Sequence, residues 1–298
     1  MNEFDYRLLF DKYRRLTENE LKRLFAVEGQ SIYPELKRAM YYSLEAGGKR
    51  IRPCLLLAVC EMLHGDVSSA LPLACGLEMI HTYSLIHDDM PGMDNDDMRR
   101  GRASNHKVFG EGLALLAGDG LLSFAVEIML AAAIRTGDSD ILDGVKEIAR
   151  LSGASGMLSG QASDKTNENS VSLNPDTLKY VHRHKTADML EAAAVAGAYA
   201  AHADKSVIDA LRAYSERIGL LFQITDDLLD VLGDEKTVGK TLGKDIAEGK
   251  LTYVSLYGKD GAKALAEKTA AEATECLSAI DNSDVLLLFA KEILKRKK

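Results

Sequence analysis

The chain has 298 residues, enough for one large domain or two small ones. Hydrophobic residues make up 46% of it, and the formal net charge of −8 argues against a general nucleic-acid-binding protein, which would carry a basic face. The first residues are charged, and no run reaches the roughly 18 apolar residues that crossing a bilayer requires, so we expect neither a secretory peptide nor a membrane span. The scattered cysteines lack metal-site spacing and favour a reduced, cytoplasmic compartment.

Helical periodicity runs through the whole chain, in which only five prolines occur. There is no alternating strand pattern of useful length and no composition shift that would mark a second domain. We therefore expect one all-α domain over residues 1–298, with its helices around a central cavity. The predicted helices are Tyr6–Phe25, Pro34–Ala46, Pro53–His64, Ser68–His87, Glu111–Thr136, Ile141–Ser163, Asn174–His202, Lys205–Leu232 and Ala262–Lys298.

An acidic segment follows the fourth predicted helix, with five carboxylates between Asp88 and Asp97. Asp88 and Asp94 are six residues apart, which would place them on different faces of an unbroken helix. Pro91 and Gly92 lie between them and break helices, so a bulge there would return Asp94 to a position over Asp88. Carboxylates gathered at the end of an apolar helix predict a hard divalent cation.

A second acidic cluster lies far downstream, at the end of the helix predicted from Lys205. Asp226 and Asp230 form an i, i+4 pair there and share one helix face. For either cluster alone, a solvated helix end is an equally good interpretation. A calcium EF-hand does not fit, because the third loop position counted from Asp88 is Met90.

Three cationic segments accompany the two acidic clusters. Residues 47–53 read Gly-Gly-Lys-Arg-Ile-Arg-Pro, which places cations and free backbone amides at a helix start and suits an oxyanion. The others are Arg99-Arg100 and the lysine-rich stretch 236–250, which lacks the spacing of a nucleotide-binding phosphate loop. Carboxylates, magnesium and several phosphate-binding cations together favour diphosphate chemistry over solvated helix ends.

These motifs resemble, in content and order, those of the trans-isoprenyl diphosphate synthases, most closely the bacterial-type farnesyl diphosphate synthases. The resemblance runs from about residue 30 to residue 257, and it departs from the family at Val254, where a proline is usual. The matching motifs are DDxxxxD at Asp88–Asp94 with Arg99-Arg100-Gly101, DDxxD at Asp226–Asp230, GGKRxRP at Gly47–Pro53, GMxxGQ at Gly156–Gln161, Lys185-Thr186 and Phe222-Gln223.

The resemblance implies a role for each matching residue. Asp88 and Asp94 would ligate two magnesium ions with Asp89 in support, and Asp226 would ligate a third with Asp230 in its outer shell. The allylic diphosphate would be held by Arg99, Lys185, Lys240 and Lys250, and isopentenyl diphosphate by Lys49, Arg52, His81 and Arg100. Thr186 and Gln223 would turn oxygens toward the allylic cation that forms when the diphosphate leaves.

The expected activity is a head-to-tail prenyl transfer that makes farnesyl diphosphate in two condensations, in a protein that forms a homodimer. The main alternative is a geranylgeranyl diphosphate synthase, and a class I terpene cyclase or a non-catalytic partner subunit also remain open. In the resembling family, an aromatic residue five positions before the first motif, together with a two-residue insertion seen here as Pro91-Gly92, goes with a fifteen-carbon product. Tyr83 is that residue here, and we expect it to form the floor of the tail cavity; the alternative is that it merely packs between helices.

Overall fold

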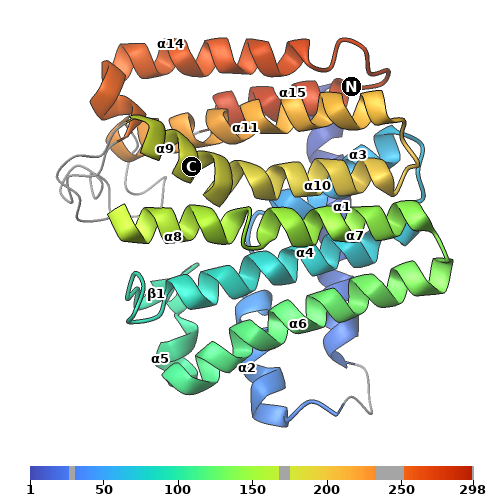
Figure 1. Cartoon of the computed structure of the whole chain (residues 1–298), viewed down its shortest axis with the longest axis vertical. Helices are drawn as coiled ribbons and strands as arrows, with labels where there is room; N and C mark the ends of the chain where they lie inside the picture. The colour runs from blue at the N-terminus through green and yellow to red at the C-terminus, as the bar shows by residue number, and fades with distance from the viewer. Residues whose placement is uncertain (27–30, 168–174, 233–251, 297–298) are drawn as a thin grey trace. The chain divides into compact units, whose positions relative to one another are not determined.

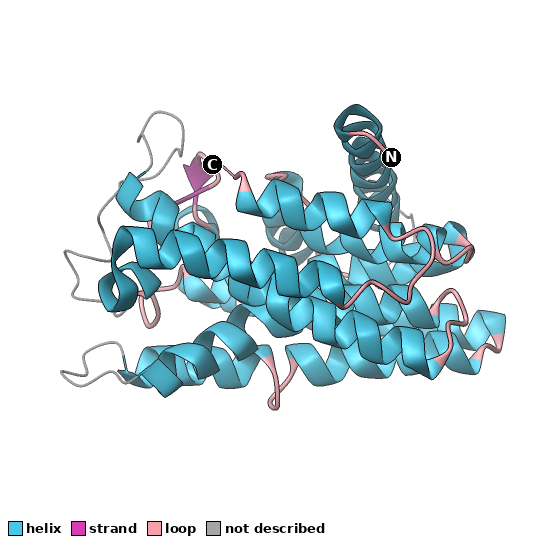
Figure 2. Ribbon diagram, turned by 90° about the horizontal axis from the view of Figure 1, so that it is seen from above, coloured by secondary structure: helices cyan, strands magenta, loops and turns pink. Residues whose placement is uncertain are grey.

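The computed structural model describes residues 1–26, 31–167, 175–232 and 252–296. Contacts within the chain divide it into two compact units. The N-terminal unit is Arg7–Ala149 with Ala196–His202, and the C-terminal unit is Met1–Tyr6, Arg150–Val195 and Ala203–Lys298. The described chain is almost entirely helical, with strand confined to one short hairpin (Figure 2), so the predicted all-α class is confirmed. The single domain over residues 1–298 and the central cavity stay predictions.

The N-terminal unit is built around α4 (Val67–Asp88), which packs against α3 and α6. The Asp66 side chain starts α4 by accepting hydrogen bonds from the backbone amides of Ser68 and Ser69, which satisfies two of the free amides of the first turn. Most of α4 is buried, so this helix fixes the acidic segment to the core. The other elements are α1 (Glu3–Ala26, after its first residues), α2 (Pro34–Glu45), α3 (Ile51–Met62), α5 (Asn105–Phe109), α6 (Glu111–Thr136) and α7 (Ser139–Ser152, up to Ala149), with β1 (Met98–Arg99) antiparallel to β2 (Arg102–Ala103).

The C-terminal unit is organised around α11 (Lys205–Leu232), which packs along α14 and α15 (Figure 1). The fully buried Tyr214 of α11 donates its hydroxyl to the carbonyl of Leu286, 2.7 Å away, and joins α11 to α15. The unit also contains a π-helix, η1, packed on both α8 and α11. Its elements are α8 (Met157–Asn167), α9 (Pro175–Val181), η1 (His182–Ala187), α10 (Asp188–Tyr199, up to Val195), α14 (Tyr253–Glu275) and α15 (Asp284–Leu294).

Several predicted helices differ from the observed ones. The helix predicted over Ile141–Ser163 is interrupted between Ser152 and Met157, and the one over Asn174–His202 contains the π-helix. The last predicted helix, Ala262–Lys298, is two helices, the first of which already begins at Tyr253.

The expected absence of a membrane span stays a prediction. By length and composition one described helix, α6, could cross a membrane, with a mean hydropathy of 1.8 over 18 residues. A core helix of a soluble protein passes the same test, so this is weak evidence for a membrane span.

Candidate active site

The first aspartate segment turns back on the end of α4. The backbone amide of Asp94 donates to the carbonyl of Asp88 at 2.8 Å, and Pro91 and Gly92 lie exposed in the intervening turn. The structure therefore brings the backbone of Asp94 to Asp88, as the helix-breaking pair predicts. Asp94 is exposed, and Asp88 is half-buried at the end of the helix.

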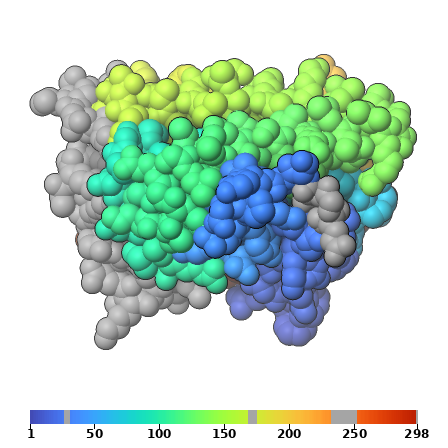
Figure 3. Space-filling model, turned by 90° about the horizontal axis from the view of Figure 1, so that it is seen from below, coloured from blue at the N-terminus to red at the C-terminus, as the bar shows by residue number. Residues whose placement is uncertain are grey.

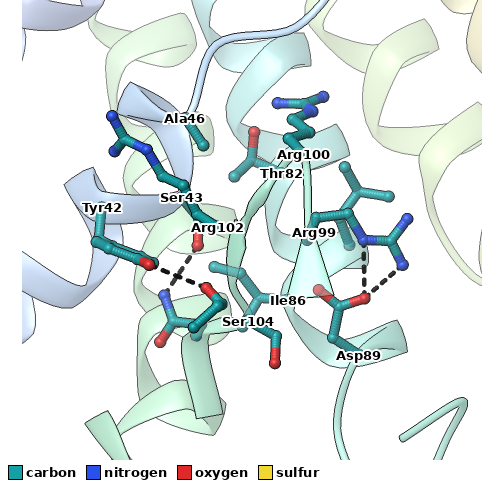
Figure 4. A pocket seen from close by; sticks show the side chains of 13 residues that line it. Tyr42, Ser43, Ala46, Thr82, Ile86, Asp89, Arg99, Arg100, Arg102 and Ser104 are labelled. Atoms are coloured by element: carbon teal, nitrogen blue, oxygen red, sulfur yellow. Dashed lines mark hydrogen bonds and ion pairs between the residues drawn. The ribbon is translucent and has the colours of Figure 1, made fainter. Parts of the chain in front are cut away.

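Asp89 is the buried member of this segment, and Arg99 of β1 neutralises it. The Arg99 guanidinium donates to one carboxylate oxygen of Asp89 through both Nε, at 2.8 Å, and Nη2 (Figure 4). Burial raises the pKa of Asp89, and Arg99 opposes that shift. Asp89 thus anchors the hairpin to α4, and in this structure the Arg99 guanidinium, predicted to hold the allylic diphosphate, is shared with a protein carboxylate.

Arg52 and His81 form a cationic corner between α3 and α4. Arg52 Nη1 lies 3.4 Å from His81 Nε2. Within the described part of the chain Arg52 makes no ion pair, and its Nε is buried without a hydrogen-bond partner. Desolvation lowers the pKa of Arg52 to about 10, and desolvation and Arg52 lower the pKa of His81 well below 6.5. The corner is therefore an electropositive site that an anion would complete.

Arg100 joins the same corner through the glycine loop. Its guanidinium donates to the carbonyl of Gly47 and lies against Gly48, where an added Cβ would meet the guanidinium carbon at 2.7 Å. Gly48 has a φ of +130°, a backbone conformation that favours glycine. Three of the four residues predicted to hold isopentenyl diphosphate, Arg52, His81 and Arg100, thus gather in one unit, and the fourth, Lys49, is exposed on the same loop.

A buried ion pair that the sequence interpretation missed holds this loop. Arg50 is 4% exposed and has a left-handed φ of 49°, and its Nη1 lies 2.6 Å from the carboxylate of Glu78, which is 1% exposed. Arg50 also donates to the carbonyl of Leu44 at 2.5 Å. The one acidic residue in the apolar run before His81 was the available signal, because a buried carboxylate needs a cationic partner.

Tyr83 lies on the face of α4 that meets α6. Its ring packs edge-on against His87, 5.7 Å between centroids, and His87 Nε2 is 3.1 Å from the carbonyl of Leu115. Gly118 of α6 makes this approach possible, because an added Cβ would stand 2.1 Å from His87 Nε2. Tyr83 is 4% exposed, and burial together with the charge of Asp88 raises its pKa to about 12. It is a neutral aromatic ring buried one to two turns before Asp88.

The second aspartate cluster lies near the end of α11. Among the described residues, Oδ2 of Asp230 is buried without a hydrogen-bond partner, whereas Oδ1 of Asp226 accepts a hydrogen bond from Arg296 at 3.1 Å. An orphaned carboxylate oxygen and a carboxylate already facing a cation are the donor set that a divalent ion suits.

Asp227, between those two, has a different function in the structure. It is 4% exposed, and its Oδ2 accepts the backbone amide of Tyr253 at 2.7 Å. Thr252 and Ser255 complete a capping box at the same end of α14. Asp227 therefore fixes the start of α14 to α11, a role that no local sequence signal indicates.

The Lys185-Thr186 pair lies on the π-helix η1. Lys185 Nζ is 2.6 Å from the carboxylate of Asp164, and the Thr186 hydroxyl donates to Oε1 of Gln223 at 3.2 Å. The two residues predicted to face the allylic cation thus do meet. Gly160 and Gly219 allow α8 and α11 to approach η1 this closely, because an added Cβ at either would stand 2.1–2.2 Å from η1 atoms.

Buried ion pairs on the other residues of η1 hold the π-helix in place. Arg183 donates to Glu191 at 2.6 Å, and His184 Nδ1 lies 2.8 Å from Asp188. Arg212 of α11 donates to the same Glu191 carboxylate at 2.8 Å. Asp188 and Glu191 are 1% and 3% exposed, so these two buried carboxylates join η1 to α10 and α11 on either side of Lys185.

Among the described residues, the three potential metal ligands whose atoms all approach within 4.8 Å are Asp138, Asp140 and His202. None of them is a predicted ligand. Asp138 caps the start of α7, and His202 Nδ1 bonds Asp140 at 2.8 Å, so the group joins two loops. Of the predicted ligands, Asp88 and Asp94 lie in the N-terminal unit and Asp226 and Asp230 in the C-terminal unit. Lys240 and Lys250 lie outside the described residues.

Comparison with known proteins gives a consistent set of relatives. The chain is 47% identical over 266 residues to the heterodimeric geranylgeranyl pyrophosphate synthase large subunit 1, chloroplastic, of Arabidopsis thaliana, covering 86% of this chain and 70% of that protein. It is 48% identical over 249 residues to the chloroplastic geranylfarnesyl diphosphate synthase of Leucosceptrum canum, covering 83% and 68%. These names favour a product longer than the farnesyl chain expected from the sequence.

Solved structures agree on the fold. An apo FPP/GFPP synthase from Zymomonas mobilis has a TM-score of 0.83 and 35% identity, covering 96% of this chain and 98% of that one. A geranyltransferase from Legionella pneumophila has a TM-score of 0.86 and 31% identity, covering 98% and 97%. The polyprenyl synthetase family model matches residues 33–292, which include the glycine loop, both aspartate motifs and the Lys-Thr pair. The chain therefore belongs to the polyprenyl synthetases, the trans-isoprenyl diphosphate synthase family.

Proposed function

We propose that this prenyltransferase condenses isopentenyl diphosphate with an allylic diphosphate and that its final product is geranylgeranyl diphosphate. The observation that carries the condensation is the corner of Arg52 and His81, where a guanidinium with no carboxylate partner among the described residues faces a neutral imidazole. A cyclase would not need this second diphosphate site. The named relatives support the twenty-carbon product.

Magnesium is the cofactor in this proposal, and the donor set fits it. Asp88 and Asp94 would hold it at the end of α4, and Asp226 with Asp230 at the end of α11, where an orphaned carboxylate oxygen is available. The family resemblance implies three ions. Bound magnesium would neutralise the charge that develops on the departing diphosphate.

Side chains of this protein would bind the two diphosphates and stabilise the allylic cation. Arg52, His81 and Arg100 would hold isopentenyl diphosphate, because two guanidinium groups and a neutral imidazole lie at one corner. Lys185 of η1, which pairs with Asp164, would hold the allylic diphosphate. The hydrogen-bonded pair of Thr186 and Gln223 would present oxygens to the allylic cation.

A fifteen-carbon product is the second candidate, and Tyr83 is the observation that favours it. A buried aromatic ring about 7.5 Å before Asp88, at 1.5 Å per helical residue, would stop the growing chain early. The overall identity to the named relatives supports the twenty-carbon product, whereas Tyr83 supports the fifteen-carbon product. The two can disagree because only a few side chains line the path of the prenyl tail.

The test is a product assay. The protein is incubated with magnesium, isopentenyl diphosphate and dimethylallyl, geranyl or farnesyl diphosphate, and the products are measured by chain length. We expect geranylgeranyl diphosphate, with none when magnesium is chelated or in Asp88→Ala. Product ending at fifteen carbons would select farnesyl diphosphate synthesis, and a cyclised hydrocarbon without elongation would contradict the condensation.

We also propose that the partner of the chain is a second copy, joined through α6. Leu115, Leu116, Val126, Leu130 and Ile134 are exposed on this helix. At about 100° per residue they fall within an arc of about 100°, so they form an apolar stripe along the helix that the exposed Asp119 and Ser123 interrupt. In Figure 3 the green atoms of α5 and α6 lie open at the surface of the face shown. A stripe of this length on a soluble protein favours an interface between copies.

A further inference from the structure

The last described residue of the chain covers the second aspartate motif. Arg296 follows α15, and its Nη2 donates to Oδ1 of Asp226 at 3.1 Å. Its guanidinium carbon also lies 4.4 Å from the ring centroid of Phe222, one turn earlier on α11. The Arg296 side chain is 18% exposed and that of Asp226 42%, so one guanidinium contacts two motif residues while Asp226 stays accessible to solvent.

We propose that Arg296 is the resident counter-cation of Asp226, a positioning residue that magnesium and diphosphate must displace. This rests on the proposed function, in which Asp226 ligates magnesium. A guanidinium and a divalent cation on one carboxylate repel each other, and more strongly where solvent is partly excluded. The metal therefore binds to Asp226 in exchange for Arg296. Breaking the ion pair between Arg296 and Asp226 opposes binding, so it lowers the apparent affinity for magnesium.

The local structure permits such an exchange without unfolding α15. Lys291 and Lys295 pair with Glu3 at 2.9 and 3.4 Å, and the N-terminal amine pairs with Asp284 at 2.6 Å, so both ends of α15 are tied to the start of α1. Arg296 lies beyond the last helical residue, Leu294, so its side chain can change partners without breaking a backbone hydrogen bond inside α15. The Phe222 ring offers the guanidinium a second favourable contact once Asp226 is occupied.

The experiment measures magnesium binding without turnover. Wild type and variants are titrated with Mg²⁺ in the presence of inorganic pyrophosphate, and the rise in melting temperature and the calorimetric heat are recorded. We expect Arg296→Gln to require roughly three- to tenfold less Mg²⁺ than wild type, as an ion pair worth about 1 kcal/mol would give. Lys295→Gln is the matched control: it removes one charge from the same turn but faces Glu3, and its midpoint is expected to equal that of wild type.

Arg296→Lys keeps the charge and is expected to stay within about twofold of wild type, which also shows that the terminus tolerates substitution. An unchanged or higher Mg²⁺ midpoint in Arg296→Gln overturns the inference, because Arg296 would then be neutral toward the metal or would help to bind it. Asp226→Asn separates the two hypotheses. If it binds Mg²⁺ and pyrophosphate like wild type, the proposed metal site itself is wrong, whatever Arg296 does.

Discussion

Arg52 and Lys185 are cations of the two predicted diphosphate sites, and their surroundings differ. Arg52 has no carboxylate partner among the described residues, whereas Lys185 shares its charge with Asp164. We expect Arg52→Ala to raise the KM for isopentenyl diphosphate by about 10- to 100-fold, the worth of a charged hydrogen bond, and the KM for the allylic substrate much less. Lys185→Ala is expected to do the reverse. Steady-state kinetics with each substrate varied in turn decides this, and equal effects of both variants would indicate one shared site.

Tyr83 decides between the two product lengths at the scale of one side chain. If it is the floor of the tail cavity, Tyr83→Ala opens the path along α4 and moves the main product one isoprene unit or more upward, with little change in the first condensation. Tyr83→Phe is the matched control, because it keeps the ring and is expected to keep the product. Radiolabelled products resolved by chain length give the answer. An unchanged product in Tyr83→Ala would leave the ring as packing against His87 and α6.

The proximity of paired motif residues was predictable from the sequence, because residues only a few positions apart on or beside a helix have a spacing that local geometry determines. Asp94 does return to Asp88, and Thr186 does meet Gln223. The partners of Arg50, Asp227 and Arg296 were not predictable, because each bridges residues 26 or more apart in the chain. Pairing at that range depends on tertiary packing, which local pattern does not contain.

Among the elements, the glycine loop before α3 depends on the ion pair between Arg50 and Glu78. Glu78→Gln leaves the buried guanidinium of Arg50 without its counter-charge, so we expect a loss of unfolding free energy of about 3–5 kcal/mol. Because this loop carries Lys49 and leads directly into Arg52 at the start of α3, the KM for isopentenyl diphosphate is also expected to rise.

Urea unfolding and substrate kinetics measure the two effects, and Glu35→Gln is the control, since it breaks an exposed pair with Arg38 worth about 0–1 kcal/mol. A stable variant with normal KM would show that the pair does not hold the loop.

The two departures from regular α-helix differ in whether the local sequence indicates them. The interruption before Met157 has a local cause in Gly156, whose added Cβ would stand 2.0 Å from the carbonyl of Leu151. The π-helix over His182–Ala187 contains neither glycine nor proline. Its cause is the buried pairing of Arg183 with Glu191 and of His184 with Asp188, which only the folded chain reveals.

At the scale of the whole molecule, the predicted metal ligands are divided between the two compact units. The family match from residue 33 to residue 292 runs through both, so neither unit holds the full set of motifs. The order of the motifs along the chain was sufficient to identify the family. Product length was not identified by the same means, because it depends on the side chains along a tail path and not on the motifs.

The apolar stripe on α6 makes the state of assembly a property that can be measured directly. Leu130 and Ile134 on this stripe are 38% and 80% exposed. Exposing apolar side chains to water is unfavourable, and contact with a second copy would remove them from water. We expect wild type to sediment as a dimer and Leu130→Glu with Ile134→Glu to sediment as a folded monomer, because two charges would face apolar side chains across the interface.

Leu142→Glu is the matched control, since Leu142 of α7 is 50% exposed but lies off the stripe, and this variant is expected to remain dimeric. Sedimentation velocity gives the masses, and circular dichroism confirms that each variant is helical. A monomeric wild type would contradict the proposal. In that case binding of α6 to lipid vesicles, which its length and hydropathy permit, becomes the measurement that identifies what covers the stripe.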